Sequence, residues 1–212
     1  MYDKLRSGML EQNADDGIEA KVPSSAQRME LASECLDHLV ATRDTFGIVF
    51  SFVLLYIARH PKAQKRLHEE LRSMTGVFRP NNNSEDSMPS AKDLESLPYL
   101  NAVLRESIRL RGNVPTSNPR YTPAGTATTL GPYKNIPPGV RISAFAWCLH
   151  RNEDIFPDAE AWIPERWLNE DKTKFEPGEL ERWFWAFGTG SRRCLGQNLA
   201  LESEMILRSS QV

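Results

Sequence analysis

The sequence has few of the features that mark several large classes of protein. Its 212 residues include only three cysteines, Cys35, Cys148 and Cys194, which are far apart and odd in number. That pattern favours reduced thiols in an intracellular protein over a secreted disulfide framework. The net charge is −2, and basic and acidic residues are interspersed, so no broad basic surface for nucleic acid or an anionic membrane is expected.

A long apolar run is also absent. The N-terminal segment lacks the apolar core of a secretory signal, and the most apolar stretch, Phe46 to Ala58, is shorter than the roughly 18 residues that predict a membrane span. We therefore expect no membrane anchor within this chain. No internal repeat is present, and the Asn-, Ser- and Pro-rich stretch from Phe78 to Ser90 predicts an insert without regular structure.

The residues that are present predict a mainly α fold with a small β-sheet region. With 40% hydrophobic and 25% charged residues, the composition is typical of a soluble globular protein. Ser24 or Ser25 can cap one long helix that runs to about His60. Its second half, from Phe46, is apolar on nearly every face, which indicates burial on all sides.

Two shorter helices and a region of strands are predicted further along. An amphipathic helix begins at Pro61 and ends near Gly76, and another runs from Pro98 to Arg111 and stops at Gly112. Beyond it, turn residues separate short β-prone segments, of which Val140 to Leu149 is the best strand candidate. These elements place a helical part first and a mixed part after it.

A cysteine loop carries the most specific chemical signal. In the segment FGTGSRRCLG, Cys194 lies just before an Ala-, Leu- and Glu-rich helical segment, where backbone N–H groups and Arg192 favour a thiolate. Gly190 permits a tight turn, Gly196 permits close approach of a flat ligand, and Phe187 can shield the sulfur from water. The alternative, from the residues alone, is a buried cysteine that follows a glycine turn.

Two charged pairs lie on predicted helices. Glu106 and Arg109 are three residues apart, so they share one helical face and can pair, although most such pairs are solvated surface pairs. Asp44 and Thr45 lie in the middle of an apolar helix, where an acid is costly unless it is paired or wetted. The two side chains either bind neighbouring groups within the helix, as an internal cap, or face a polar cavity.

Two further segments carry polar residues. Val114 to Arg120 is an extended, Pro-containing stretch, and from the residues alone Arg120 is predicted to be a solvated cation. Cys148 and His150 lie two apart on the predicted strand and suggest a metal pair. Two ligands do not make a site, however, and both residues fit ordinary core or edge roles.

The spacing Phe-x-x-Gly-x-Arg-x-Cys-x-Gly resembles the haem-binding loop of the cytochrome P-450 family. The other clusters follow in the family's order: Asp44-Thr45, then Glu106-x-x-Arg109, then Pro164-Glu165-Arg166-Trp167. The resemblance covers roughly residues 29 to 207. It implies a C-terminal fragment of a haem-thiolate monooxygenase of the eukaryotic microsomal type, in which residues 26–212 form part of the haem domain after a polar segment, 1–25.

The resemblance also implies roles for the proximal and structural residues. Cys194 would be the thiolate ligand of the haem iron, and Arg192 and Arg120 would pair with haem propionates. Val114 to Ser117 would line the substrate pocket. Glu106, Arg109 and Arg166 would form a structural triad that does not touch substrate.

On the distal side, the resemblance implies that Asp44 and Thr45 relay protons to bound dioxygen. Two residues depart from the family pattern, since Thr42 replaces the usual glycine and Phe46 replaces a frequent second hydroxyl residue. Threonine can still loosen a helix by bonding back to the carbonyl one turn earlier.

The implied reaction inserts one oxygen atom of dioxygen into a small organic substrate. Its electrons would come from NADPH through cytochrome P-450 reductase or a similar donor, and full-length relatives would reside at the endoplasmic reticulum membrane. Because the chain is far shorter than a family member, a truncated, catalytically inactive fragment is the alternative. A third hypothesis keeps the haem and changes the reaction to isomerisation or dehydration, against which Asp44 and Thr45 argue.

Overall fold

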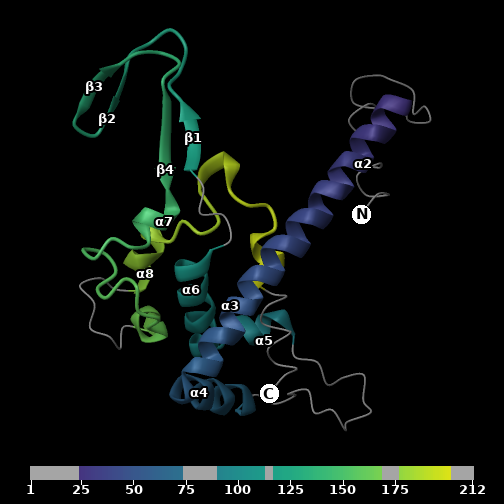
Figure 1. Ribbon diagram of the computed structural model, residues 1–212, viewed down its shortest axis with the longest axis vertical. Helices are drawn as coiled ribbons and strands as arrows, with labels where there is room; N and C mark the ends of the chain where they lie inside the picture. Colours follow the sequence, from purple (N-terminus) through teal and green to yellow (C-terminus); the bar gives the residue numbers. More distant parts are fainter. Residues whose placement is uncertain (1–23, 74–89, 113–116, 169–176, 202–212) are drawn as a thin grey trace. The chain divides into compact units, whose positions relative to one another are not determined.

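The computed structural model describes residues 24–73, 90–112, 117–168 and 177–201 (Figure 1). The chain divides into two compact units, Met1–Gly47 and Ile48–Val212. Residues 78–89 of the expected insert and residues 114–116 of the expected pocket segment lie outside the described residues.

Helices and short helical turns dominate the described residues, and the strands are few, so the mainly α fold class is confirmed. In chain order the elements are α2 (Ser25–Val40), the π-helical turn η1 (Ala41–Thr45), α3 (Phe46–Arg59), α4 (Pro61–Arg72), α5 (Ala91–Glu95), α6 (Pro98–Arg111), β1 (Ser117–Tyr121), β2 (Thr128–Leu130), β3 (Tyr133–Ile136), β4 (Arg141–Phe145), α7 (Ala146–Leu149), the 3-10 turn η3 (Pro164–Leu168), α8 (Pro177–Leu180), and the 3-10 turns η4 (Glu181–Trp183) and η5 (Gly190–Arg192).

Helix α2 begins at a capping box. The Ser24 hydroxyl accepts a hydrogen bond from the Gln27 N–H at 3.3 Å, and the Gln27 side chain accepts one from the Ser24 N–H at 2.9 Å. Reciprocal bonds of this kind satisfy two backbone donors that a helix N-terminus leaves unpaired. The helix start predicted at Ser24 or Ser25 is therefore confirmed.

Helical structure continues without a break from Ser25 to Arg59. By length and composition alone, this stretch could cross a membrane, whereas the sequence expectation of no anchor considered only the shorter run from Phe46 to Ala58. The same test is passed by core helices of soluble proteins and by signal sequences. The finding therefore assigns no location to the chain.

The burial expected around the second half of this helix is not observed. Val53 is the buried residue of α3, whereas Ile48, Leu54 and Leu55 are exposed. A helix that is apolar on every face needs neighbours on every face. Within the described residues of the second unit, the hydrophobic cluster that includes Val53 also takes in Val49 and other partly buried residues of α3, and this covers only part of the helix surface.

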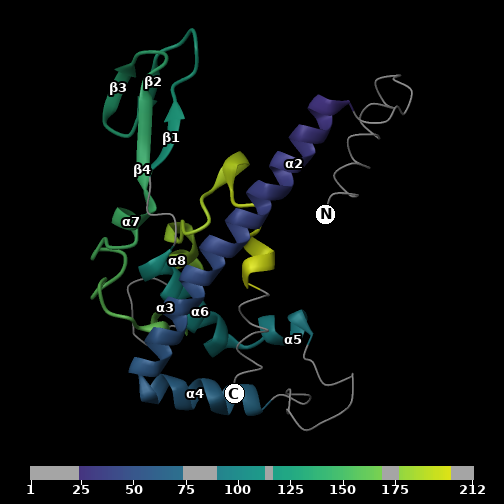
Figure 2. The ribbon, with the colours of Figure 1, turned by 45° about the vertical axis from the view of Figure 1, so that its right-hand side comes forward.

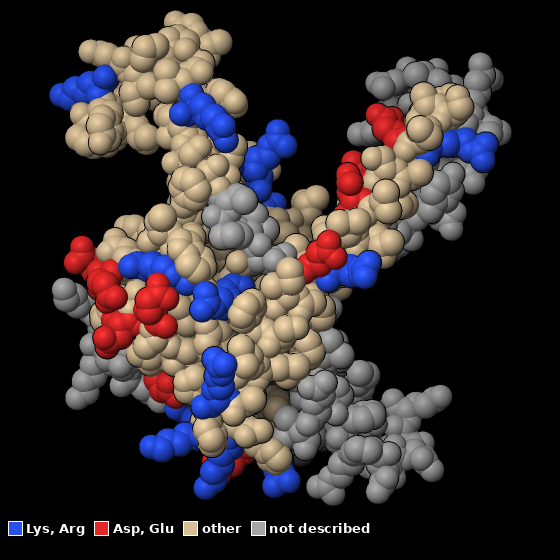
Figure 3. All heavy atoms as spheres, viewed as in Figure 1, with Lys and Arg blue, Asp and Glu red and all other residues tan. Residues whose placement is uncertain are grey.

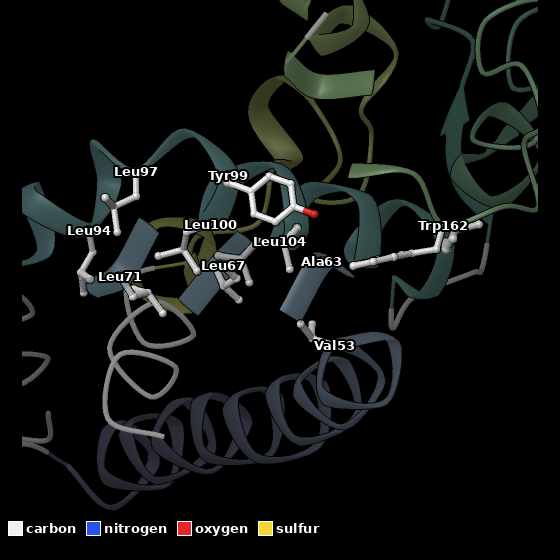
Figure 4. Packing of buried hydrophobic residues seen from close by; sticks show 12 residues of the cluster. Val53, Ala63, Leu67, Leu71, Leu94, Leu97, Tyr99, Leu100, Leu104 and Trp162 are labelled. Carbon is white, nitrogen blue, oxygen red and sulfur yellow. The ribbon is translucent and has the colours of Figure 1, made fainter. Parts of the chain in front are cut away.

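The main hydrophobic core lies between α4 and α6 (Figure 4). Helix α4 begins at Pro61, as predicted, and buries Ala63, Leu67 and Leu71 at four-residue spacing, so these side chains form one stripe. Helix α6 contributes the largest set of buried residues to the cluster, which are Tyr99, Leu100, Val103, Leu104 and Leu110.

Helix α6 has the bounds that the sequence predicts, and α4 supplies its N-terminal cap. Leu97 offers no side-chain bond at this end. Instead, the two carboxylate oxygens of Glu70 accept hydrogen bonds from the N–H groups of Tyr99 and Leu100, each at 2.8 Å. A carboxylate at a helix N-terminus is stabilised by these free donors and by the helix dipole.

The strands form two antiparallel pairs. Strand β1 pairs with β4 from Ser117↔Phe145 to Tyr121↔Arg141, and β2 pairs with β3 as the hairpin that lies between them in the chain. Both ribbon views show this hairpin at the end of the β1–β4 pair (Figures 1 and 2). The β region is thus a ribbon of local pairings.

The strand predicted from Val140 to Leu149 is wrong in its second half. Strand β4 ends at Phe145, and Ala146–Leu149 form the helical turn α7. The His150 N–H donates to the Ala146 carbonyl at 2.8 Å, and the Arg109 side chain binds the His150 carbonyl at 2.6 Å. These contacts turn the chain toward α6, and sequence alternation gives no sign of them.

Charged side chains of both signs lie on the surface of the second unit (Figure 3). Neither sign covers a continuous face in that view. This distribution agrees with a net charge of −2.

Candidate functional site

A buried charge cluster joins α6 to η3. The Glu106 carboxylate accepts bonds from Arg109 Nε at 2.9 Å and Nη2 at 2.8 Å, and from Arg166 Nε at 3.0 Å. The side chains of all three residues are fully buried. The structure thus brings together the three residues of the expected triad, and the bidentate contact is the strongest geometry available to an arginine and a carboxylate.

Arg109 uses every guanidinium N–H. Besides its bonds to Glu106, it donates to the carbonyl oxygens of His150 at 2.6 Å, Ala159 at 2.8 Å and Ala161 at 3.1 Å. Because a guanidinium has five N–H donors and no acceptor, this arrangement leaves none unpaired. The loop that leads to η3 thus binds one side chain of α6 through three carbonyl groups.

Two partners of Glu106 were not predicted from sequence. Trp167 Nε1 donates to Glu106 Oε2 at 3.0 Å, and the Ile163 N–H donates to Oε1 at 3.0 Å. Trp167 lies directly after Arg166, so it enters the site with η3. The sequence does hold one sign of this contact, since Trp167 follows the arginine of a predicted charge cluster. A buried indole N–H usually finds an acceptor, and the Glu106 carboxylate is an acceptor in that cluster.

His150 is a further buried residue at this junction. Its side chain stacks on the Phe184 ring, with centroids 5.8 Å apart and an interplanar angle of 19°. Burial lowers the pKa of His150 to about 4, and the positive charge of Arg109 acts in the same direction. The imidazole is therefore neutral near pH 7.

His150 and Cys148 do not form a metal pair. Both ring nitrogens of His150 bind backbone groups, those of Arg109 and Trp185, so neither is available to a metal. Cys148 is exposed on α7. His150 thus has an ordinary core role, which is one of the two roles expected from its sequence.

The cysteine loop is a compact turn with an exposed thiol. The Cys194 N–H donates to the Phe187 carbonyl at 2.9 Å, and both Gly188 and Gly190 adopt a φ of +69°. Residues other than glycine rarely adopt this backbone conformation. Residues 197–201 are helical, so the loop ends in a helix, as expected, and Cys194 lies exposed before it.

The surface around the thiol suits a flat apolar ligand. Leu195 is 93% exposed and Leu199 60% exposed, although leucines are usually buried. A Cβ added at Gly196 would meet only Cys194 Sγ, at 4.0 Å, so the backbone is bare there. A soft sulfur donor beside exposed leucines and a bare backbone fits a haem held by a cysteine thiolate.

The two arginines expected at haem propionates are exposed. Arg192 belongs to the turn η5, two residues before Cys194. Arg120 lies on β1, and its Nη1 donates to the neighbouring Pro119 carbonyl at 2.8 Å. Both guanidinium groups carry the charge and the donors that a carboxylate ligand needs.

The Asp44–Thr45 pair lies in the π-helical turn η1 of the first unit. Thr42 Oγ1 donates to the His38 carbonyl at 2.8 Å, and Thr45 Oγ1 donates to the Ala41 carbonyl. Such bonds one turn back bend or loosen a helix, and π-helical turns are frequent at functional sites. The helix is therefore irregular at the position where Thr42 replaces a glycine.

Comparison with known proteins agrees with these features. A family model described as cytochrome P-450 matches residues 2–209. Cytochrome P-450 monooxygenase avaI of Aspergillus versicolor is 32% identical over 190 residues, which cover 86% of this chain and 45% of that protein.

Two other curated relatives share the same pattern. Cytochrome P-450 monooxygenase ankB of Aspergillus thermomutatus is 35% identical over 171 residues, or 81% of this chain and 30% of that protein. Cyclooctat-9-en-7-ol 5-monooxygenase of Streptomyces melanosporofaciens is 33% identical over 178 residues, or 84% and 35%. The chain thus spans 30% to 45% of the length of these relatives.

The match of the family model over nearly the whole chain, together with fungal relatives at this level of identity, agrees with the eukaryotic type that the motifs imply. The chain belongs to the cytochrome P-450 family.

Proposed function

We propose that the chain binds haem through Cys194 and is the haem-ligating part of a monooxygenase. The observation that carries this proposal is the exposed thiol of Cys194, set in a glycine turn between apolar residues that are also exposed. Family membership supports the identity of the ligand. On this basis residues 26–212 are part of a haem domain, and residues 1–25 precede it.

Residues of the cysteine loop and of β1 hold the haem through different contacts. Cys194 supplies the thiolate, while Arg192 and Arg120 supply charge-assisted hydrogen bonds to the propionates. Gly190 allows the turn, and Gly196 allows close approach of the macrocycle. The Phe187 carbonyl accepts the Cys194 N–H, and once the macrocycle covers the thiol, the Phe187 ring limits the access of water to the sulfur.

The bound haem supplies an iron whose thiolate ligand favours cleavage of the O–O bond. In the overall reaction, one oxygen atom of dioxygen enters a small organic substrate and the other leaves as water, with two electrons and two protons consumed. The electrons come from NADPH through cytochrome P-450 reductase or a similar donor. For the whole protein we propose an intracellular location at the endoplasmic reticulum membrane.

Asp44 and Thr45 deliver the protons in this proposal. Thr45 Oγ1 donates its hydrogen to the Ala41 carbonyl, so its oxygen keeps lone pairs that can accept a hydrogen bond. Rotation of the hydroxyl then releases its own hydrogen for transfer. The exposed Asp44 side chain takes up a proton from water and passes it to the Thr45 oxygen, which restores the hydroxyl. The hydrogen bond from Thr42 to the His38 carbonyl supports an opened helix here without the usual glycine.

The test is the spectrum of the reduced, carbon-monoxide-bound chain. We expect a Soret band at the thiolate-ligated position that disappears in Cys194→Ser. Cys148→Ser is the matched control, because Cys148 is a second exposed cysteine, on α7, and its substitution should leave the band intact. Purified protein that takes up no haem, or a thiolate-type band that survives in Cys194→Ser, would contradict the proposal.

Haem binding without turnover is the second candidate function. The exposed apolar side chains of α3, Ile48, Leu54 and Leu55, favour it, because a pocket that holds an organic substrate normally covers such surface. The two candidates differ in a reconstituted assay with NADPH and a reductase. Oxygenated product formed in step with NADPH consumption supports the monooxygenase. A haem-loaded chain that forms no oxygenated product supports the second candidate.

A further inference from the structure

His150 connects two parts of the second unit through a single imidazole. Its side chain lies between the C-terminal end of α6 and the residues that lead to the cysteine loop, and the residue is 3% exposed. Nδ1 lies 3.1 Å from the Arg109 carbonyl oxygen, and Nε2 lies 3.0 Å from the Trp185 N–H nitrogen. A carbonyl only accepts and a backbone N–H only donates, so the ring is neutral and carries its hydrogen on Nδ1.

The first contact belongs to the end of α6. The last carbonyl groups of a helix have no partner within the helix. Here the Arg109 carbonyl accepts from His150 Nδ1 and the Leu110 carbonyl accepts from Arg151 Nη2 at 3.0 Å. In return, Arg109 Nη1 binds the His150 carbonyl at 2.6 Å. His150 is therefore fixed to the buried triad through both its backbone and its ring.

The second contact leads toward the cysteine loop. The His150 ring stacks on Phe184, and the Phe184 ring meets the Phe187 ring edge to face, with centroids 6.3 Å apart. The Phe187 carbonyl in turn accepts the Cys194 N–H at 2.9 Å. Two hydrogen bonds and two ring contacts thus run from Arg109 to Cys194.

We propose that His150 is a positioning residue that ties the segment from Phe184 to Phe187, and with it the cysteine loop, to the buried triad. The consequence for the haem ligand rests on the proposed function, whereas the link itself concerns only atoms of this chain. Glu181 of η4 also pairs with Arg105 of α6, at the surface, whereas His150 is buried and binds the Trp185 N–H of the segment itself.

Protonation of the ring would break the link. A hydrogen on Nε2 would point at the Trp185 N–H, and two donors cannot share a bond. The charged groups that face the ring are Arg109 and Glu106 on α6 and Arg151 beside it. Burial is the main cause that holds the pKa of His150 near 4, the two arginines also lower it, and Glu106 opposes them. The link therefore persists at neutral pH and opens in acid.

Three substitutions separate the ring's packing from its hydrogen bonds. His150→Phe keeps an aromatic ring and removes both bonds. His150→Gln offers an amide oxygen near the position of Nε2 as an acceptor for Trp185, and it does not titrate in this range. His60→Gln is the matched control, because His60 is a second histidine that bonds a backbone carbonyl, that of Tyr56, and packs against Trp162.

Amide hydrogen exchange in the haem-free full chain tests the link. In His150→Phe we expect the Trp185 and Cys194 N–H groups to exchange about tenfold faster or more, because a lost bond opens its segment locally. His150→Gln should change both rates much less, and His60→Gln should leave them unchanged. If His150→Phe does not fold, His150→Asn takes its place, since it keeps a donor near Nδ1 and lacks an acceptor at Nε2. Unchanged exchange at Trp185 in the folded variant overturns the proposal.

The pH profile of the haem-loaded chain gives a second readout. We expect the thiolate-type band of the reduced, carbon-monoxide-bound protein to be lost in acid at a lower pH in His150→Gln than in the wild type, and at a higher pH in His150→Phe. Equal acid midpoints in the three proteins overturn the role of the ring's protonation. If Cys194→Ser keeps the band, the haem assignment fails while hydrogen exchange at Trp185 still tests the link, so the two failures are distinguishable.

Discussion

The buried triad and the cysteine loop differ in how far their functional groups are buried and paired within the protein. At the junction of α6 and η3, Glu106, Arg109 and Arg166 are all at most 1% exposed, and Arg109 has a protein partner for each N–H. In the loop, the Cys194 thiol is exposed and Leu195 is 93% exposed. In the first region the protein itself supplies the partners of Arg109, whereas the second region presents its groups to a partner from outside.

This difference predicts which property each region controls. Substitutions in the triad should lower the free energy of unfolding, because they leave charges buried without partners. Substitutions in the loop should change ligand binding and leave the stability of the haem-free chain nearly intact. We expect the largest losses of stability in the triad and the smallest in the loop.

Glu106→Gln should have the largest effect on stability. The change removes the only negative charge of the triad and leaves two buried arginines uncompensated, which costs about 3–5 kcal/mol. Urea unfolding followed by circular dichroism measures the loss. Glu181→Gln is the control, because Glu181 pairs with Arg105 at the surface, where an ion pair contributes about 1 kcal/mol or less. Equal losses in the two variants would contradict the contrast.

Acid should weaken the connection between the two regions through His150. Its pKa is about 4 in the folded chain and about 6.5 as a model value, so the unfolded state binds the proton more readily between these values. The free energy of unfolding should therefore fall as pH falls from about 6.5 to about 4, by about 3 kcal/mol from this group. The measurement is the difference between wild type and His150→Gln across that window. A constant difference would refute the prediction.

Trp167→Phe should destabilise the triad moderately. The change removes the hydrogen bond from Nε1 to Glu106 Oε2, and a bond to a charged group contributes about 1.5–3 kcal/mol. Trp162→Phe provides the comparison, because Trp162 Nε1 donates to the neutral Ser107 hydroxyl at 3.0 Å, a bond of about 1 kcal/mol. Thermal unfolding of both variants, with the larger loss at Trp167, would support a charged Glu106.

Cys194→Ser should have the smallest effect on the haem-free chain. The side chain is exposed, so its substitution should change the free energy of unfolding by less than about 0.5 kcal/mol. The same variant should lose haem binding through sulfur, which titration with haem and absorbance spectroscopy would detect. A large loss of stability without haem would show that the loop is part of the core.

The local part of the architecture could be predicted from sequence. The bounds of α6 follow from Pro98 and Gly112, because proline is accepted in a first helical turn and glycine ends a helix. A Cβ on Gly112 would lie 3.0 Å from the Ile108 carbonyl, which is a tight contact. Within α6, the spacing of Glu106 and Arg109 predicted that they share a face, since residues three apart are neighbours on a helix.

Other features depended on contacts between distant residues. The helical turn at Ala146–Leu149, predicted as strand, is held by Arg109 from α6. The cap of α6 comes from Glu70 on α4. Neither leaves a trace in the spacing of residues nearby, because each partner lies more than 25 positions away along the chain.

By itself, the sequence determined the mainly α fold, the helix bounds around the triad and the spacing of the cysteine loop, because capping, periodicity and glycine turns act over a few residues. Only the tertiary structure decided that Arg109 has no unpaired donor, that Trp167 joins Glu106 and that His150 bridges the triad and the loop. These facts depend on contacts between residues 35 to 61 positions apart in the chain. Burial then makes each such bond matter, since a buried polar group without a partner is costly.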